Sequence, residues 1–311
     1  MQAPPQITTL PAWLKLLYPF RTSSLAVGSE HMSFINEGDP SSPPLVMVHG
    51  SPAWSLLWRH VIPEVSGRFH VVAPDNVGFG LSSKPDDPAY HTLERHIDNL
   101  TALVEELRLK GVTLVLHGWG GPIGLGYATR FPENVSRIVL MNTWIGPWSM
   151  VKQSWALRFI ASGLGSTLAF KTSAVRSLGM KLVTRKPLPE NTLRGYLFPF
   201  TRTDEREGLL AFYRMRAVDS GDHEFDTFTR IAESLLSLHA RVEILWGVQD
   251  RLLPGKVLPY LLRDQFANAQ VPKLLPECGH LVPEEDPAAV IEKIMEVFQP
   301  KPKPAVFNIL K

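Results

Sequence analysis

A buried strand, a tight glycine turn and a helix follow one another without a break at residues 114–128. The strand is mostly apolar, the turn contains Gly118, Gly120 and Gly121, and the remaining residues are typical of the start of a buried helix. Glycines at such a turn let a helix pack closely on its strand and let the backbone take a strained conformation. The pattern therefore predicts a strand–elbow–helix unit, which requires a sheet with helices packed against it.

An elbow of this kind is where some hydrolytic enzymes hold their nucleophile, and here its tip is Gly118, which has no side chain. Upstream, residues 44–52 are a buried-type strand that ends in a His-Gly turn. Such a turn supplies one backbone N–H of an oxyanion hole, and we expect the two N–H groups to be those of Ser51 and Trp119. The sequence thus predicts an anion-stabilising site beside an empty nucleophile position.

A carboxylate and an imidazole follow at the ends of two later strands. Residues 242–250 are a strand that ends on Asp250, and residues 274–280 are a further strand and turn that end on His280. The chain order is therefore nucleophile position, acid and base. This is the order of α/β-hydrolases, and it differs from that of other folds with a catalytic triad.

Several motifs resemble those of haloalkane dehalogenases. Residues 49–59, residues 73–85 and the elbow with Trp119 after its tip carry this resemblance, which spans residues 20–298. It implies an α/β-hydrolase fold, with a mostly parallel central sheet, helices on both faces of the sheet and an inserted helical cap. It also implies an enzyme that needs no cofactor and no metal.

Within this group the chain is most similar to the branch that contains the β-lactone decarboxylases of bacterial long-chain olefin biosynthesis. Residues 18–21, 95–100 and 187–190 carry this finer resemblance. The resemblance implies a small or long-chain apolar substrate, either a haloalkane or a β-lactone. We expect Trp144 and Trp148 to line the substrate pocket.

The resemblance implies a covalent mechanism. An Asp at position 118 would attack a carbon that bears a leaving group held by the Trp119 indole. His280, oriented by Asp250, would then activate the water that hydrolyses the ester. The same Asp would open a β-lactone, which loses carbon dioxide.

Two residues depart from the family pattern. Gly118 replaces the Asp nucleophile, so no ester can form there, and the chain is expected to be inactive or impaired. Ser51 stands where most dehalogenases of this type have an Asn that helps to hold the released halide. Trp119, Asp250 and His280 keep the residue types that their roles need.

Three functional hypotheses stay open. The chain is an enzyme of this branch that lacks its Asp, or a pseudoenzyme that binds a hydrophobic ligand, or a hydrolase in which His280 and a bound water act without a covalent step. The first is favoured because Asp250 and His280 are both present. The space above Gly118 is about the size of a carboxylate, and we expect a water or a small anion to fill it.

Alternation of short apolar strands with helical patterns divides the chain into segments. The expected α/β core is residues 21–145 and 235–298, with early strands at residues 31–36, 45–48, 70–73, 113–117 and 137–142. Residues 146–234 read as a helical cap rich in aromatic residues, and residues 299–311 as a proline-rich tail. Residues 1–20 form an N-terminal amphipathic segment, which we expect to lie on the domain surface, with a membrane surface or an enzyme complex as the alternative.

Composition limits the partners of the chain. Its 311 residues carry 32 Lys and Arg against 30 Asp and Glu, so no strong field attracts nucleic acid. One cysteine excludes an internal disulfide framework. With no secretion signal and no long apolar run in the sequence, we expect a cytoplasmic enzyme; its oligomeric state is left open.

Each motif also has a plainer interpretation. The glycine turn is a poor dinucleotide fingerprint, because Ile123 stands where the third glycine should be. Asp250 is a candidate helix cap, His117 a core histidine that points away from the site, and Cys278 a small core residue. Residues 222–226 have metal-ligand residue types without metal-ligand spacing, which favours a solvated loop.

Overall fold

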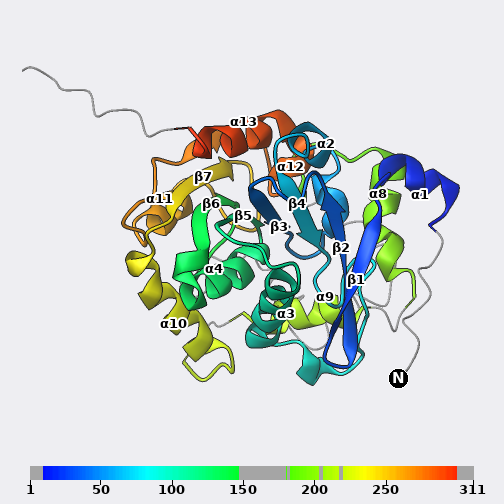
Figure 1. The fold of residues 1–311 in the computed structure, drawn as a ribbon, viewed down its shortest axis with the longest axis horizontal. Helices are drawn as coiled ribbons and strands as arrows, with labels where there is room; N and C mark the ends of the chain where they lie inside the picture. The colour runs from blue at the N-terminus through cyan, green and yellow to red at the C-terminus, as the bar shows by residue number, and fades with distance from the viewer. Residues whose placement is uncertain (1–9, 147–179, 181–182, 203–205, 217–219, 300–311) are drawn as a thin grey trace, which may run out of the picture.

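The computed structural model describes residues 10–146, 180, 183–202, 206–216 and 220–299. In these residues an eight-stranded sheet with the order β1-β2-β4-β3-β5-β6-β7-β8 runs through the centre of the molecule (Figure 1). The strands are β1 (Thr22–Val27), β2 (Glu30–Glu37), β3 (Pro44–Val48), β4 (His70–Pro74), β5 (Val112–His117), β6 (Val135–Met141), β7 (Arg241–Gly247) and β8 (Lys273–Leu275).

Strands β3 to β8 run parallel to one another, whereas β2 is antiparallel to both β1 and β4. The mostly parallel sheet that the sequence predicts is confirmed. The hairpin partner β1 was not predicted, because its residues are mostly exposed or half-buried and show no apolar run. Gly28, with a φ of 65°, makes the tight turn into β2.

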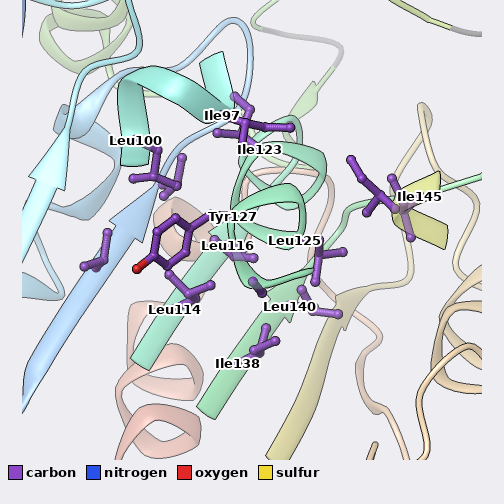
Figure 2. Close-up of a cluster of buried hydrophobic side chains, with 14 of the residues drawn as sticks. Ile97, Leu100, Leu114, Leu116, Ile123, Leu125, Tyr127, Ile138, Leu140 and Ile145 are labelled. Carbon is purple, nitrogen blue, oxygen red and sulfur yellow. The ribbon is translucent and has the colours of Figure 1, made fainter. Parts of the chain in front are cut away.

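Helices cover both faces of the sheet. Successive residues of a strand point to opposite faces, and in the central strands the residues on both faces are apolar and buried. On one face, Leu114 and Leu116 of β5 belong to a buried cluster with α3 (Leu93–Glu106), α4 (Gly120–Arg130), α10 (Phe225–Ser234) and α11 (Leu258–Arg263). Figure 2 shows these leucines with the side chains of α3 and α4. On the other face, Val115 belongs to a second cluster with α2 (Ile62–Val65), α12 (Val282–Glu285) and α13 (Pro287–Val297).

Between β6 and β7 the described residues form helices and no strand. They are α8 (Glu190–Leu197), α9 (Glu207–Arg214) and α10, with short 3-10 turns at Phe198–Phe200 and Leu235–Ser237. Trp148 lies outside the described residues, as do residues 300–311 of the expected tail. The boundaries of the cap and of the other segments stay a prediction.

The N-terminal segment contains the short helix α1 (Ala12–Leu17). Its residue Leu14 is fully buried, while Leu16 is 86% exposed. Tyr18 follows the helix, and its hydroxyl lies 2.7 Å from Oγ of Ser55 in the core domain. This segment therefore packs on the protein. No helix of the described ranges is long and apolar enough to cross a membrane.

Four buried histidines, His49, His91, His96 and His117, make the fold sensitive to acid. Burial lowers the pKa of His49 and of His91 to about 4, that of His117 to about 3, and that of His96 well below its usual value. The unfolded chain protonates these histidines near pH 6.5, whereas the folded chain keeps them neutral. The free energy of unfolding is therefore highest above pH 6.5 and falls as the pH is lowered toward the folded pKa values. Buried Asp75 acts in the opposite direction, since its pKa is raised to about 6, but it binds only one proton.

We expect the free energy of unfolding to fall steeply between pH 6.5 and pH 4. Each histidine that stays neutral costs about 1.4 kcal/mol per pH unit. Burial also lowers the pKa values of His31, His60 and His70, so the histidines together outweigh the carboxyl groups whose pKa values burial raises, which are Asp75, Asp98, Glu224 and Glu285. Urea unfolding at pH 7.5, 6 and 5 measures this slope, and His91→Gln should reduce it by about one proton. Equal free energies at pH 7.5 and pH 5 would contradict the burial of these rings as neutral groups.

Candidate active site

The elbow at Gly118 has the geometry that the sequence predicts. Gly118 joins β5 to α4 with a φ of 53°, in the left-handed region. Its carbonyl accepts hydrogen bonds from Thr143 Oγ1 at 2.6 Å and from the Gly121 N–H at 3.0 Å. A Cβ atom at Gly120 would lie 2.0 Å from the Val48 carbonyl oxygen, so this glycine allows α4 to pack against β3. The structure therefore confirms the strand–elbow–helix unit.

The His-Gly turn after β3 contacts the elbow directly. A Cβ atom at Gly50 would lie 2.6 Å from the backbone N of Trp119 and 2.9 Å from Cα of Gly118. The adjoining Ser51 and Trp119 are both half-buried, which leaves this corner of the site partly open. The two N–H groups assigned to the oxyanion hole thus come from segments that touch.

His49 fixes the shape of this turn. Its Nε2 accepts a hydrogen bond from the Asn76 N–H at 2.9 Å, so its proton is on Nδ1, which donates to the Gly50 carbonyl at 3.0 Å. Because burial lowers the pKa of His49 to about 4, the ring keeps this neutral form at neutral pH.

Asp250 and His280 lie together, as the chain order predicts. His280 Nδ1 lies 2.7 Å from Asp250 Oδ2, and both side chains are buried. The other carboxylate oxygen, Oδ1, accepts the N–H groups of Leu252 at 2.7 Å and Leu253 at 3.0 Å. Asp250 therefore caps the turn that follows β7 and also holds the imidazole of His280. It is not a helix cap, because α11 begins only at Leu258.

Asn142 is a residue of the site that sequence reasoning missed. It follows β6 with a φ of 38°, and its Nδ2 donates to Asp250 Oδ2 at 2.7 Å. The same side chain amide donates to the Gly247 carbonyl at 3.1 Å and accepts the Gly247 N–H at 2.8 Å. Asn tolerates a positive φ better than most residues, so an Asn directly after a strand was the sequence signal that could have identified this turn. Asn142 thus holds the acid against the neighbouring strand.

Replacement of Asn142 by Leu is expected to destabilise the fold by about 2–4 kcal/mol, because it leaves the Gly247 N–H without a partner and removes one of the two hydrogen bonds to Asp250 Oδ2. Urea unfolding measures the loss. Asn99→Leu is the matched control, since the buried Asn99 side chain makes one hydrogen bond within the described residues, from its Nδ2 to the Tyr90 hydroxyl at 3.1 Å. A loss at Asn142 no larger than the loss at Asn99 would contradict the bridging role.

The imidazole of His280 faces the empty side of Gly118. A Cβ atom built on Gly118 would lie 3.4 Å from His280 Nε2 and 3.3 Å from Cα of Gly50. In the described part of the chain, Nε2 has no hydrogen-bond partner, while Nδ1 is held by Asp250. A side chain at position 118 would therefore point at the free nitrogen of the His280 imidazole.

His117 lies behind this pair. As expected it is a buried core residue, but it is not isolated from the site, because its Nε2 donates to the His280 carbonyl at 2.8 Å. Its Nδ1 is buried without a partner in the described residues. Burial lowers the pKa of His117 to about 3, so it holds the His280 loop as a neutral donor. Buried Cys278, whose pKa burial raises to about 12, has the properties of a core thiol.

Aromatic side chains from the helices between β6 and β7 pack on the elbow. The Trp119 ring makes edge contacts with Phe212 of α9 at 5.3 Å and with Phe228 of α10 at 6.0 Å between centroids. Trp144, proposed for the substrate pocket, is buried within the core cluster beside β6. The side of the elbow that faces α9 and α10 is therefore apolar.

Comparison with known proteins agrees with this geometry. The alpha/beta hydrolase fold family matches residues 43–287. A cis-3-alkyl-4-alkyloxetan-2-one decarboxylase of Shewanella oneidensis is 34% identical over 288 residues, which covers 90% of this chain and 89% of that protein. A haloalkane dehalogenase of Mycobacterium marinum is 27% identical, over 89% of this chain and 94% of its own length. Among solved structures, a haloalkane dehalogenase from Bradyrhizobium elkani superposes with a TM-score of 0.81 at 23% identity, covering 89% of this chain and 98% of that one.

Proposed function

The chain belongs to the alpha/beta hydrolase fold family, and we propose that its site binds an apolar β-lactone or haloalkane beside His280 but turns it over poorly, because Gly118 occupies the nucleophile position. One observation carries the proposal. The missing side chain of Gly118 would point at His280 Nε2 from 3.4 Å, while Asp250 still holds the other ring nitrogen. Asp250 and His280 are both in place, and the nucleophile that would form the ester is absent.

A β-lactone is the favoured substrate class. The relative that is 34% identical is named for an oxetan-2-one, which is a β-lactone. Decarboxylation of such a ring gives an alkene and carbon dioxide, so no halide is released and no water is consumed. A site for this reaction does not need the Asn that holds a halide, and Ser51 at that position fits the lactone better.

A second candidate is direct hydrolysis by His280. With its Nδ1 held by Asp250 and its Nε2 free in the described residues, His280 has the arrangement of a general base for a water above Gly118. This route lacks the covalent step and would be slower than that of an enzyme with an Asp at position 118.

Turnover of a cis-3,4-dialkyloxetan-2-one and of a 1-bromoalkane by Gly118→Asp tests the substrate class. We expect alkene from the lactone at a higher kcat/KM than bromide from the haloalkane. Faster release of bromide than of alkene would replace the lactone proposal with dehalogenation.

Ser51→Asn in the Gly118→Asp background should raise kcat/KM for the bromoalkane about 10-fold or more. The added amide donates a charge-assisted hydrogen bond to the departing halide, and one such bond is worth about 1.5–3 kcal/mol. The lactone reaction, which releases no halide, should change little. Bromide release and alkene formation measured on the same preparations check both parts, and an equal effect on the two substrates would contradict this role of position 51.

A further inference from the structure

We propose that the space above Gly118 binds the carboxylate of an apolar monocarboxylic acid, so that the ligand supplies the carboxylate that the chain lacks. This inference rests on the proposed position of the site, between Gly118 and His280. It concerns the protein with its glycine, and it assigns a ligand class to the site in that form.

The first observation is an unpaired polar atom aimed into the space. His280 is 3% exposed, and its Nε2 has no hydrogen-bond partner in the described ranges. Because Nε2 is not itself fully enclosed, a ligand oxygen can reach it and supply the missing hydrogen bond. A Cβ atom built on Gly118 would lie 3.4 Å from this nitrogen, so a carboxylate bound above Gly118 can contact it.

The second observation concerns charge. Asp250 already accepts N–H groups from Asn142, Leu252 and Leu253 and is paired with His280 Nδ1. A carboxylate on Nε2 would place the imidazole between two carboxylates, which favours its protonated form. A proton held between Nε2 and the ligand oxygen would then join the ring to the carboxylate.

The nearby histidines do not supply that charge. Burial lowers the pKa of His117 to about 3 and that of His49 to about 4, so both rings are neutral near pH 7. The backbone N–H groups of the touching Gly50 and Trp119 turns add partial positive charge at the elbow. His280 is therefore the group that distinguishes a carboxylate from a neutral headgroup.

The apolar tail follows from the residues around the elbow. Trp119 is half-buried, and its ring packs edge-on against Phe212 and Phe228. Phe212 in turn packs on Phe79, with 4.6 Å between ring centroids. An alkyl chain gains free energy next to such rings, whereas a second charged group would lose its hydration.

Calorimetric titration with decanoate and with 1-decanol tests the inference on the full chain. We expect decanoate to bind about 10- to 100-fold more tightly than decanol, in line with one charge-assisted hydrogen bond. Titration near pH 7.5 in two buffers of different ionisation enthalpy should show uptake of up to one proton with decanoate and none with decanol. His280→Gln should remove the preference for decanoate and the proton uptake together.

Gly118→Asp provides the sharpest contrast, because its carboxylate would fill the space and repel the ligand. Decanoate should then bind at least about 100-fold more weakly, while decanol binding is retained and shows that the pocket is intact. Equal affinity for the two ligands in the unchanged protein, no binding of either, or decanoate binding that survives Gly118→Asp would overturn the inference. The turnover of Gly118→Asp tests the proposed function separately, since it does not depend on carboxylate binding to the unchanged protein.

Discussion

Replacement of Gly118 by Asp is expected to raise kcat/KM for a β-lactone or a haloalkane by about 10⁴-fold or more. The change restores the covalent step, and loss of a nucleophile from a complete triad costs up to about 10⁶-fold in other hydrolases. The rest of the arrangement is in place, because His280 Nε2 lies 3.4 Å from the new Cβ position and Asp250 holds His280 Nδ1 at 2.7 Å.

The substitution fits the elbow with small adjustments. The nearest atoms to the added Cβ, at 3.3 and 3.4 Å, need to move by only a few tenths of an ångström. A side chain at a φ of 53° is strained by about 1–2 kcal/mol, although Asp and Asn tolerate this region better than other residues. Gly118→Asn is therefore the matched control, since it has the same shape and strain but no nucleophilic carboxylate.

Alkene or bromide release, followed over time, compares the two variants. The Asn variant should stay as slow as the unchanged protein. A folded Gly118→Asp protein that is no more active than Gly118→Asn on lactones and haloalkanes would contradict the proposed function and favour a pseudoenzyme.

In the Gly118→Asp background, His280→Ala is expected to stop turnover of a haloalkane after the first half-reaction. The carboxylate can still displace bromide, but no base remains to activate the water that hydrolyses the ester. One equivalent of bromide should appear in a burst, followed by a steady rate reduced about 10²-fold or more. His223→Ala is the control, because this side chain is 85% exposed.

The lactone should behave differently in the same variant, since its decarboxylation consumes no water. The ester at position 118 is therefore expected to accumulate with the bromoalkane. With the lactone, turnover can continue without His280 and the ester need not accumulate. Turnover of the haloalkane at the rate of the parent variant would show that His280 is not the base.

Two parts of the structure could be predicted from the sequence: the buried strands, from their continuous apolar runs, and the Asp250–His280 pair, from its order in the chain. The strands β3 to β7 are buried on both faces, so their residues are apolar almost throughout. Asp250 was found because it follows one of these strands, β7, and His280 because it follows the short strand β8, in the order of a known triad. The structure places their side chains 2.7 Å apart.

Other parts of the site left little signal in the sequence. Asn142 bonds to Asp250 from a neighbouring strand, and a polar residue 108 positions away has no spacing that marks the contact. The alternation of residues along the strand correctly predicted that His117 is buried, but it could not show that the ring donates to the His280 carbonyl. The partly exposed β1 was missed because its stability depends on pairing with β2 and not on an apolar pattern.

Peptide mapping of the Gly118→Asp/His280→Ala protein after incubation with 1-bromohexane tests most directly the claim that position 118 is the nucleophile position facing His280. We expect one residue, the one introduced at position 118, to carry a hexyl group, and Gly118→Asn/His280→Ala treated in the same way to carry none. An unmodified position 118, or a hexyl group on another carboxylate at equal yield in both proteins, would contradict it.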